Sequence, residues 1–390
     1  MLPEPVAAAL RAAAVPVCAY VYQRAALRAA AARLGAELPA GTILLYAVKA
    51  NGHPDVVATL AGCLDGLEVA SGGELALAVA AGARRVVFGG PAKTDAELAA
   101  AVAAGALVNV ESAHELRRLA LVADRLRPAA PPRVALRVNR PDAALAGSHV
   151  MAGAPTPFGI EEAQLGAALA LARGLPSIRV VGFHLHAVSN NTDAGAHAAF
   201  IAAAARWAAT TAVRHRLALE YVNVGGGLGV DYLGGGAMSL AGLRDGLAAA
   251  VHALPAGAEL VLEPGRYLAA EAGWYAAEVL DLKRTHGRWF AVLRGGTHHF
   301  RLPAAWGYSH PFTVLPVPAW PYPFDRPAVH DARVDAVGEL CTPRDVLARD
   351  QPVARLRVGD VLVFGLAGAY GWDISHHDFL RHPHPQMLVV

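Results

Sequence analysis

Eight short apolar runs recur along the first two-thirds of the chain, and each ends in polar residues or glycine. Alanine- and leucine-rich stretches of helical composition separate them. Strands buried on both faces form continuous hydrophobic runs, so we expect each run to be a strand of a parallel sheet. The runs are LLYAVKAN (44–51), GLEVASGGE (66–74), VVFGG (86–90), LVNVES (107–112), RVALRVNR (133–140), VVGFHLHAVS (180–189), YVNVGGG (221–227) and LVLEPGR (260–266).

The number of runs favours a closed barrel over an open sheet. Eight strand–helix units in roughly 220 residues match the usual size of a (β/α)8 TIM barrel, although an open doubly wound sheet would also alternate strands with helices. Beyond about residue 270 the pattern changes to short strand-like runs separated by turns, in VLDLKRTHGRWFAVLRGG (279–296), ARVDAVGELC (332–341) and RVGDVLVFGLAGAYG (357–371). The Pro-rich segment 302–324 has the composition of a connecting loop.

These patterns predict an α/β fold with two domains. The first is a TIM barrel over residues 24–270. The second is a mainly β domain over residues 271–390, joined by an N-terminal strand within residues 1–23. A chain of 390 residues is long enough for two hydrophobic cores.

Composition excludes several classes of function. Hydrophobic residues make up 55% of the chain, and the net charge is +2 without a run of like charges, so we expect no nucleic-acid surface. The N-terminus lacks the cationic start and apolar core of a signal peptide, and no long uncharged stretch is free of helix-breaking residues, so we expect no membrane span. Three cysteines without a CxxC motif fit a reducing, cytoplasmic setting.

The candidate chemistry starts at Lys49, one of three lysines in a chain with 34 lysines and arginines. Burial at a strand end would favour a neutral amine, which can attack a carbonyl to form a Schiff base. The alternative is a packed stem whose amine reaches solvent. TIM-barrel active sites form at the carboxyl ends of the strands. The residues that we expect there are Lys49, Ser71, Glu111, Arg137, His186, glycines 225–227 and Glu263.

Three motifs at these ends each allow two interpretations. GGGLG (225–229) suits a phosphate site or an ordinary turn. EPGR (263–266) offers a carboxylate for a protonated ring nitrogen and a guanidinium for an anion, or merely a surface salt bridge. FHLH (183–186) presents two histidines on one strand face, as metal ligands or as an imidazole lying flat on an aromatic cofactor.

Six motifs in order resemble decarboxylases of the alanine-racemase fold class that depend on pyridoxal 5'-phosphate (PLP), such as ornithine and diaminopimelate decarboxylases. The motifs are YAVKAN, GFHLHAVS, GGGLG, EPGR, GELCTPRD and AGAYG, and they span nearly the whole chain. Three further stretches resemble the siderophore-pathway branch of this family, whose best-known member acts on a citryl-diaminopropionate intermediate: VFGGPAKTDAEL (87–98), RGGTHHFRLP (294–303) and GWDISHHDFLRHPHP (371–385).

The resemblance implies a role for each matched residue. Lys49 would hold PLP covalently, His186 would stack on its ring, and Glu263 would pair with its ring nitrogen. A homodimer would share its active sites, with Cys341 and Asp345 of the partner subunit reaching each site and Cys341 protonating the carbanion left by CO2. The residues implied at the phosphate are Ser189, Gly226, Gly227, Gly265, Arg266 and Tyr370.

Glu263 itself favours decarboxylation. PLP accepts the released electrons only while its ring nitrogen stays protonated, which a carboxylate promotes. Alanine racemases of the same fold class place an arginine at that nitrogen. Glu263 is therefore typical of chemistry that leaves a full carbanion.

Departures from the family pattern concern the phosphate and the substrate. Many relatives have His-Ile-Gly-Ser where this chain has HAVS (186–189), so one phosphate-contacting glycine is missing. After Cys341, this chain has Thr342-Pro343-Arg344 where diaminopimelate enzymes usually have Glu-Ser-Gly, with the glutamate facing a distal ammonium. The exchange favours a substrate with extra carboxylates. The residues expected to contact that substrate are Arg301, Arg344, Asp345, His376 and His377, the alternatives being solvated charges or an interface.

The sequence therefore predicts a PLP-dependent carboxy-lyase with a small-molecule substrate and no metal. The favoured substrate is a citryl-amino acid intermediate of carboxylate siderophore biosynthesis. One alternative is a decarboxylase of the diaminopimelate, ornithine or lysine type. Another is a binding protein that has lost PLP, although the presence of Lys49, Glu263 and Cys341 argues against it.

Overall fold

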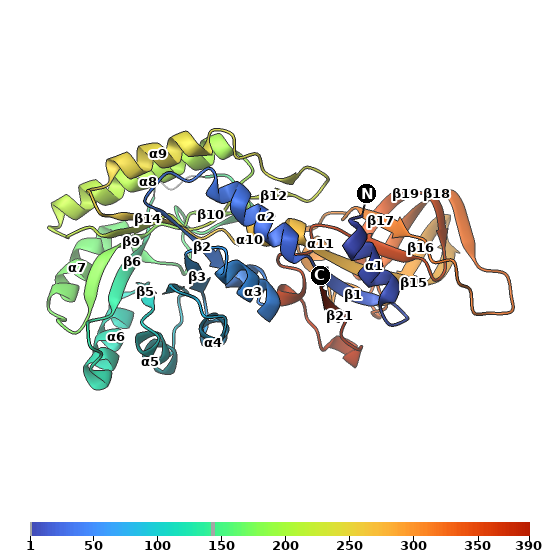
Figure 1. Ribbon diagram of the computed structural model, residues 1–390, viewed down its shortest axis with the longest axis horizontal. Coiled ribbons are helices and arrows are strands. Elements are labelled where there is room, and N and C mark those ends of the chain that lie inside the picture. The colour runs from blue at the N-terminus through green and yellow to red at the C-terminus, as the bar shows by residue number, and fades with distance from the viewer. Residues whose placement is uncertain (1, 142–144) are drawn as a thin grey trace. The chain divides into compact units, whose positions relative to one another are not determined.

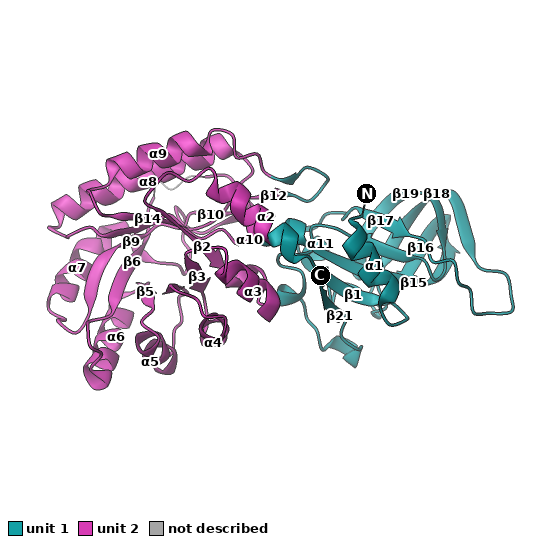
Figure 2. Cartoon of the chain, in the orientation of Figure 1, with its two compact units in different colours: residues 1–27, 231–237, 269–390 teal, residues 28–230, 238–268 magenta. Residues whose placement is uncertain are grey.

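The computed structural model describes residues 2–141 and 145–390, which form two compact units (Figure 2). Unit 1 contains the chain up to Leu27, Asp231–Ala237 and Ala269–Val390. Unit 2 contains Arg28–Val230 and Met238–Leu268.

Within the described residues, unit 2 is a closed barrel of parallel strands with helices around it (Figure 1). The strands follow one another in the order β5-β4-β3-β2-β14-β11-β9-β6, and pairing of β5 with β6 closes the ring. The predicted TIM barrel is confirmed, and each of the eight apolar runs overlaps one of its strands. These are β2 (Thr42–Ala47), β3 (Gly66–Val69), β4 (Val86–Phe88), β5 (Leu107–Val110), β6 (Arg133–Asn139), β9 (Arg179–His184), β11 (Tyr221–Asn223) and β14 (Glu259–Leu262).

An apolar layer fills the barrel, and a polar layer lies beyond it. One hydrophobic cluster takes a buried side chain from each of seven strands: Leu45, Val87, Leu107, Ala135, Val181, Tyr221 and Val261. Side chains alternate along a strand, so the residue two positions later shares the same face. At four strands that residue is polar and buried: Asn109, Arg137, Asn223 and Glu263. The carboxyl ends of the strands therefore carry polar groups above a closed apolar floor.

Helices of unit 2 begin at capping residues that the sequence displays. Ser71 Oγ accepts the backbone N–H of Glu74, Thr94 and Glu97 form a reciprocal capping box, and Ser112 Oγ accepts the N–H of Glu115. Ser71, which we expected among the polar site residues, thus caps a helix. The helices between or after the barrel strands are α3 (Pro54–Ala61), α4 (Gly72–Ala80), α5 (Asp95–Ala103), α6 (Ala113–Leu126), α7 (Leu165–Arg173), α8 (Ala194–Arg214), α9 (Leu243–Ala253) and α10 (Arg266–Ala269), and α2 (Arg24–Gly35) precedes β2.

Short strands connect the longer elements. The pair β7 (His149–Val150) and β10 (Val188–Ser189) is antiparallel, and β8 (Ile160–Glu161) pairs in parallel with the end of β6. A second pair joins β12 (Val230–Asp231) to β13 (Gly236–Ala237).

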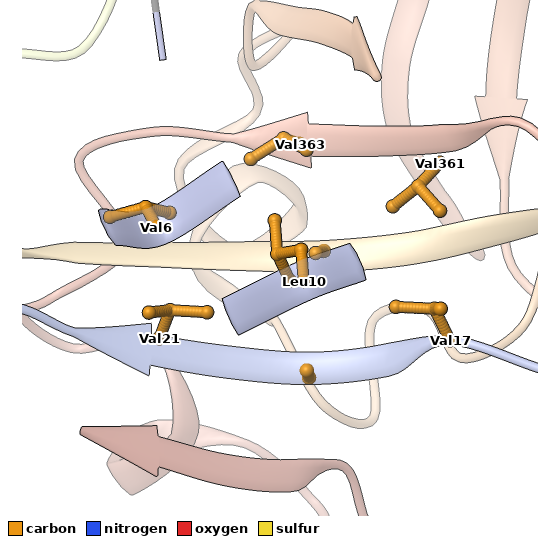
Figure 3. Packing of buried hydrophobic residues seen from close by; sticks show 8 residues of the cluster. Val6, Leu10, Val17, Val21, Val361 and Val363 are labelled. Carbon is orange, nitrogen blue, oxygen red and sulfur yellow. The ribbon is translucent and has the colours of Figure 1, made fainter. Parts of the chain in front are cut away.

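Unit 1 is built on a mainly antiparallel sheet in the order β17-β20-β15-β16-β18-β19, with β1 paired to β15 and β21. Val6 and Leu10 of helix α1 (Glu4–Ala12) pack on Val21, Val361 and Val363 of this sheet (Figure 3). Burial of such side chains contributes about 1.5–3 kcal/mol each. The strands are β1 (Cys18–Tyr22), β15 (Gly273–Thr285), β16 (Arg288–Leu293), β17 (Phe312–Leu315), β18 (Ala328–Val337), β19 (Val346–Arg357), β20 (Val361–Phe364) and β21 (Gln386–Val389).

The Pro-rich segment 302–324 differs from the predicted loop. It contains helix α11 (Leu302–Trp306), in which proline occupies the first turn, and strand β17. Proline is tolerated there because the first-turn N–H has no helical partner. Among the helices of the described chain, none is both long and apolar enough to cross a bilayer.

Candidate active site

Lys49 follows β2 in a short 3-10 helix, Val48–Ala50, and pairs with a carboxylate that the sequence analysis did not single out. Its Nζ lies 3.0 Å from Oε2 of Glu68 on β3. The side chain of Lys49 is 42% exposed, whereas that of Glu68 is 4% exposed. The expected burial of the amine is therefore wrong, because the Lys49 side chain is partly open to solvent and only its carboxylate partner is buried. Burial raises the pKa of Glu68, and the charge of Lys49 offsets only part of that increase.

Glu263 lies just beyond β14 and is buried. Asn223 Nδ2 donates a hydrogen bond to its Oε1, and His184 Nε2 lies 3.4 Å from its Oε2. Burial alone would raise the pKa of Glu263, but His184, Lys49 and Asn223 together hold it below its ordinary value. Glu263 is consequently a carboxylate at neutral pH.

The two histidines of FHLH differ in their contacts. Their ring centroids lie 6.3 Å apart with 14° between the ring planes. His184 faces Glu263, whereas His186 Nδ1 accepts the backbone N–H of Gly226 at 3.3 Å. Desolvation, followed by the charges of Lys49 and Arg137, lowers the pKa of His186 far below its ordinary value, so its imidazole is neutral. In residues 2–141 and 145–390, no three His, Cys, Asp or Glu side chains are grouped as metal ligands would be.

The glycine turn after β11 lies against both His186 and Glu263. Gly225 and Gly227 have positive φ values of 73° and 99°. A Cβ on Gly225 would lie 2.3 Å from His186 Nδ1, and one on Gly226 would lie 2.3 Å from the backbone oxygen of Glu263. Glycine is therefore required for this close approach of backbone to site.

The EPGR turn brings the lysine segment into the same site. A Cβ on Gly265 would lie 2.8 Å from Cβ of Ala50, which neighbours Lys49. Arg266 is buried at the start of α10, and Ser189 in β10 is half-buried. The barrel thus places its amine, its neutral imidazole, its glycine turn and its carboxylate at one end.

These barrel residues fit PLP. The cofactor carries an aldehyde, a ring nitrogen and a phosphate. The aldehyde requires an amine, the ring nitrogen an acid, and the phosphate small residues whose N–H groups can approach an anion. Lys49, Glu263 and Gly225–Gly227 supply these groups. The glycines leave open a space that a side chain at the same positions would fill.

One further ion pair and one amide lie at the strand ends. Arg137 Nη1 donates to Glu111 Oε1 at 2.8 Å, and the other oxygen of Glu111 accepts the N–H of Gly159. Asn223, like Glu68, was not predicted as a site residue. Its signal was available in the YVNV run, because a polar side chain two residues after Tyr221 shares the interior face with it.

In unit 1, Cys341 is exposed on the loop between β18 and β19. Asp345 is buried, and its carboxylate accepts the backbone N–H groups of Thr297 at 2.6 Å and Leu340 at 2.8 Å. Glu339, on the other side of Cys341, forms an ion pair with Arg294. Two carboxylates therefore hold the loop that presents the cysteine, and both oxygens of Asp345 are already used.

A cavity of about 800 Å³ in unit 1 borders this loop. It brings together the predicted Arg301, Arg344 and His376, and it adds Arg349, which was not predicted. No Asp or Glu occurs among the described residues that line it. His377 is not part of the lining, because its ring stacks on Trp372 with centroids 3.5 Å apart. Tyr370 is half-buried in unit 1 after β20, with a φ of 53°.

Comparison with known proteins adds independent information. A family model described as "Pyridoxal-dependent decarboxylase, pyridoxal binding domain" matches residues 24–270. A Staphylococcus aureus protein named 2-[(L-alanin-3-ylcarbamoyl)methyl]-2-hydroxybutanedioate decarboxylase is 39% identical over 99% of this chain and 97% of its own length. Diaminopimelate decarboxylase of Deinococcus radiodurans is 35% identical over 89% of this chain and 83% of its own.

The fold is shared with a solved decarboxylase. The crystal structure of diaminopimelate decarboxylase from Helicobacter pylori, complexed with L-lysine, matches with a TM-score of 0.84 at 24% identity, over 96% of this chain and 91% of that one. The family model covers more than half of the chain, and the relatives above align along most of it. This chain therefore belongs to the pyridoxal-dependent decarboxylases, which are PLP-dependent carboxy-lyases acting on amino acids.

Proposed function

We propose that this enzyme removes the α-carboxylate from the amino-acid part of a citryl amide of the diaminopropionate type, in the biosynthesis of a carboxylate siderophore. The observation that carries the proposal is the cationic cavity beside the Cys341 loop. The Staphylococcus aureus relative is named for a substrate of this kind. That name describes a hydroxybutanedioate with two carboxylates, joined through an amide to the side chain of an α-amino acid.

The charge of the cavity suits the hydroxybutanedioate end. Arg301, Arg344 and Arg349 can each donate charge-assisted hydrogen bonds to a carboxylate. Desolvation and the neighbouring charge of Arg301 lower the pKa of His376, so it offers a neutral N–H rather than a fourth cation. Ornithine, lysine and diaminopimelate each carry a distal ammonium, which this cavity would repel.

The barrel residues would hold PLP and set its charge. Lys49 would bind its aldehyde carbon, Glu263 would keep its ring nitrogen protonated, and the neutral ring of His186 would lie on its face. When bound, PLP supplies a conjugated ring that takes up the electron pair left by departing CO2. The residues proposed for its phosphate are Ser189, Gly226, Gly227, Gly265, Arg266 and Tyr370.

Cys341 would return a proton to the α-carbon after CO2 leaves. We infer that it comes from the partner subunit of a homodimer, as the family resemblance implies. The exposure of Cys341 and the fixation of its loop by Asp345 support this role. In this arrangement Asp345 positions the loop, and His377 supports Trp372 rather than the substrate.

The domain organisation and the setting form part of the same proposal. Residues 24–270 would be the PLP-binding barrel, and residues 271–390 with the strand in 1–23 would be the domain that completes the site. Pairing of β1 with β15 supports this assignment of the N-terminal strand. A cytoplasmic location would suit the free thiol of Cys341.

Measurement of CO2 release tests the proposed substrate. The PLP-loaded enzyme would be offered the citryl amide of diaminopropionate, diaminopimelate, ornithine and lysine. We expect kcat/KM for the citryl amide to exceed the others by about 100-fold or more, the equivalent of one or two charge-assisted contacts. Equal or faster release from a free diamino acid would overturn the citryl proposal in favour of the diaminopimelate- or ornithine-type activity. Absence of a cofactor absorbance band would instead indicate a non-catalytic protein.

A further inference from the structure

Asn223 has a partner for every polar atom of its side chain, although it is fully buried on β11. Its Nδ2 donates to Glu263 Oε1 and to the hydroxyl of Tyr221, the latter at 2.8 Å. Its Oδ1 accepts the backbone N–H of Gly225 at 2.8 Å. One amide therefore contacts both the acid and the glycine turn of the barrel site.

These partners permit one orientation of the amide. A flipped Asn223 would turn its oxygen toward the Glu263 carboxylate and its NH2 toward the N–H of Gly225, which would lose both hydrogen bonds. The donor end faces an ionised acceptor, and the acceptor end faces a backbone donor. An aspartate at this position could accept the N–H of Gly225 but could not donate a hydrogen bond to Glu263.

A backbone bond completes the connection. The N–H of Glu263 donates to the carbonyl of Gly225 at 2.9 Å. Asn223, Gly225 and Glu263 thus form a closed hydrogen-bonded ring that joins the end of β11 to the end of β14. Movement of the acid would disturb the turn, and movement of the turn would disturb the acid.

We propose that Asn223 is a positioning residue that holds Glu263 and the glycine turn as one unit, so that the acid for the ring nitrogen and the turn for the phosphate keep a fixed separation. The amide also favours the ionised form of Glu263, because a donor stabilises a carboxylate more than it stabilises a protonated carboxyl. This inference rests on the proposed roles of Glu263 and the glycines in PLP binding, and it is independent of the citryl substrate.

The test is the isosteric variant Asn223→Asp, with Asn139→Asp as its matched control. Asn139 lies on barrel strand β6 and makes a corresponding set of contacts, with a neutral carbonyl in place of the carboxylate: Nδ2 donates to the Ala154 carbonyl and the Thr156 hydroxyl, and Oδ1 accepts the N–H of Gly153. For each variant, the PLP dissociation constant and the absorbance spectrum of bound PLP would be measured from pH 6 to 9, a range we choose for the experiment. Because the readouts are binding and spectrum, failure of the citryl substrate would not be mistaken for failure of this inference.

We expect Asn223→Asp to weaken PLP binding about 10- to 100-fold, the loss of a hydrogen bond to a charged group, and to shift the pH dependence of the spectrum. The control should match the wild type.

The reciprocal double variant Asn223→Asp with Glu263→Gln should recover PLP binding, because an amide at position 263 can donate to the new carboxylate, while decarboxylation stays lost. Wild-type affinity and spectrum in Asn223→Asp would overturn the proposal. If the single variant does not fold, a folded, PLP-binding double variant supports it, and an unfolded double variant contradicts it.

Discussion

Lys49 Nζ lies 3.0 Å from Glu68 Oε2. Lys49 lies just after β2, and Glu68 lies on the neighbouring strand β3, in register with Ala47. The exposure of the partners is unequal, because the carboxylate is buried and the amine is partly open to solvent. A buried charge without a partner is costly. Lys49 therefore has a structural role before any cofactor arrives, which is to neutralise Glu68.

Replacement of Lys49 by Ala should destabilise the cofactor-free enzyme in a pH-dependent way. Glu68 already has a raised pKa, and loss of Lys49 removes the charge that lowers it. Since the folded state then favours protonated Glu68 more than the unfolded state does, stability falls as pH rises above the ordinary value of 4.5. We expect a loss of about 1–3 kcal/mol in the free energy of unfolding at neutral pH. The loss should lie at the low end of this range because solvent screens the exposed amine.

Thermal unfolding of the cofactor-free variants at pH 5 and pH 8 checks this prediction. Adding Glu68→Gln to Lys49→Ala should restore most of the stability at pH 8. Lys283→Ala, which removes an exposed lysine paired with Asp281, is the control and should show no such pH dependence. Equal destabilisation of Lys49→Ala at both pH values would contradict the account.

Cys341→Ala should abolish most decarboxylation while leaving PLP bound. Loss of a positioned proton donor typically reduces kcat about 10²- to 10⁴-fold. Cofactor absorbance and CO2 release would be measured on the same sample. Cys63, which is also an exposed free cysteine but lies in unit 2, provides the control variant Cys63→Ala. Unchanged turnover in Cys341→Ala would exclude it as the proton donor.

Arg344→Glu should weaken the substrate through its dicarboxylate end. The new carboxylate faces the cavity that Arg301 and Arg349 also line. We expect KM for the citryl amide to rise about 10- to 100-fold, equivalent to a contact of roughly 1.5–3 kcal/mol. Free citrate should compete with substrate in the wild type and lose this effect in the variant. Arg355→Glu, at an exposed position of β19 outside the cavity, should leave KM unchanged; an equal effect there would argue for a general charge effect.

Asp345→Asn should loosen the Cys341 loop. An amide can accept from only one of the two N–H groups that Asp345 now satisfies, and its NH2 would face the other. We expect a loss of about 1–3 kcal/mol in unfolding free energy and a larger fall in kcat than in substrate affinity. Asp350→Asn, at an exposed acid of β19, the strand that follows the loop, is the matched control. Wild-type kcat and melting temperature in Asp345→Asn would show that the loop does not depend on it.

The barrel was predictable because its strands are buried on both faces, so that each forms an uninterrupted apolar run ending in polar residues. The glycine turn and Glu263 were visible for the same reason, since both directly follow such runs. Glu68 was not predictable, because its proximity to Lys49 follows from the register of β2 and β3, which sequence alone does not provide. The position of Asn223 two residues after Tyr221 marked it as an interior polar residue, but its contact with Glu263 depends on the pairing of β11 with β14.

Unit 1 shows a second limit of sequence reasoning. The family resemblance implies Asp345 as a site residue, and the sequence does not show that its carboxylate accepts backbone N–H groups from Thr297 and Leu340. Arg349 faces the cavity only because of the way β19 continues from that loop. The helix in the Pro-rich segment was missed because LPAAW places proline where a helix tolerates it.

The most direct test of the central claim is to locate PLP on the chain. Borohydride reduction would fix the cofactor to whichever lysine holds it, and peptide mass spectrometry would identify that lysine. The chain has three candidates: Lys49, Lys93, whose amine is buried against Glu115, and Lys283, which is exposed. We predict the modification on the peptide containing Lys49 and on neither of the others; a modification at Lys93 or Lys283, or on no lysine, would contradict the account.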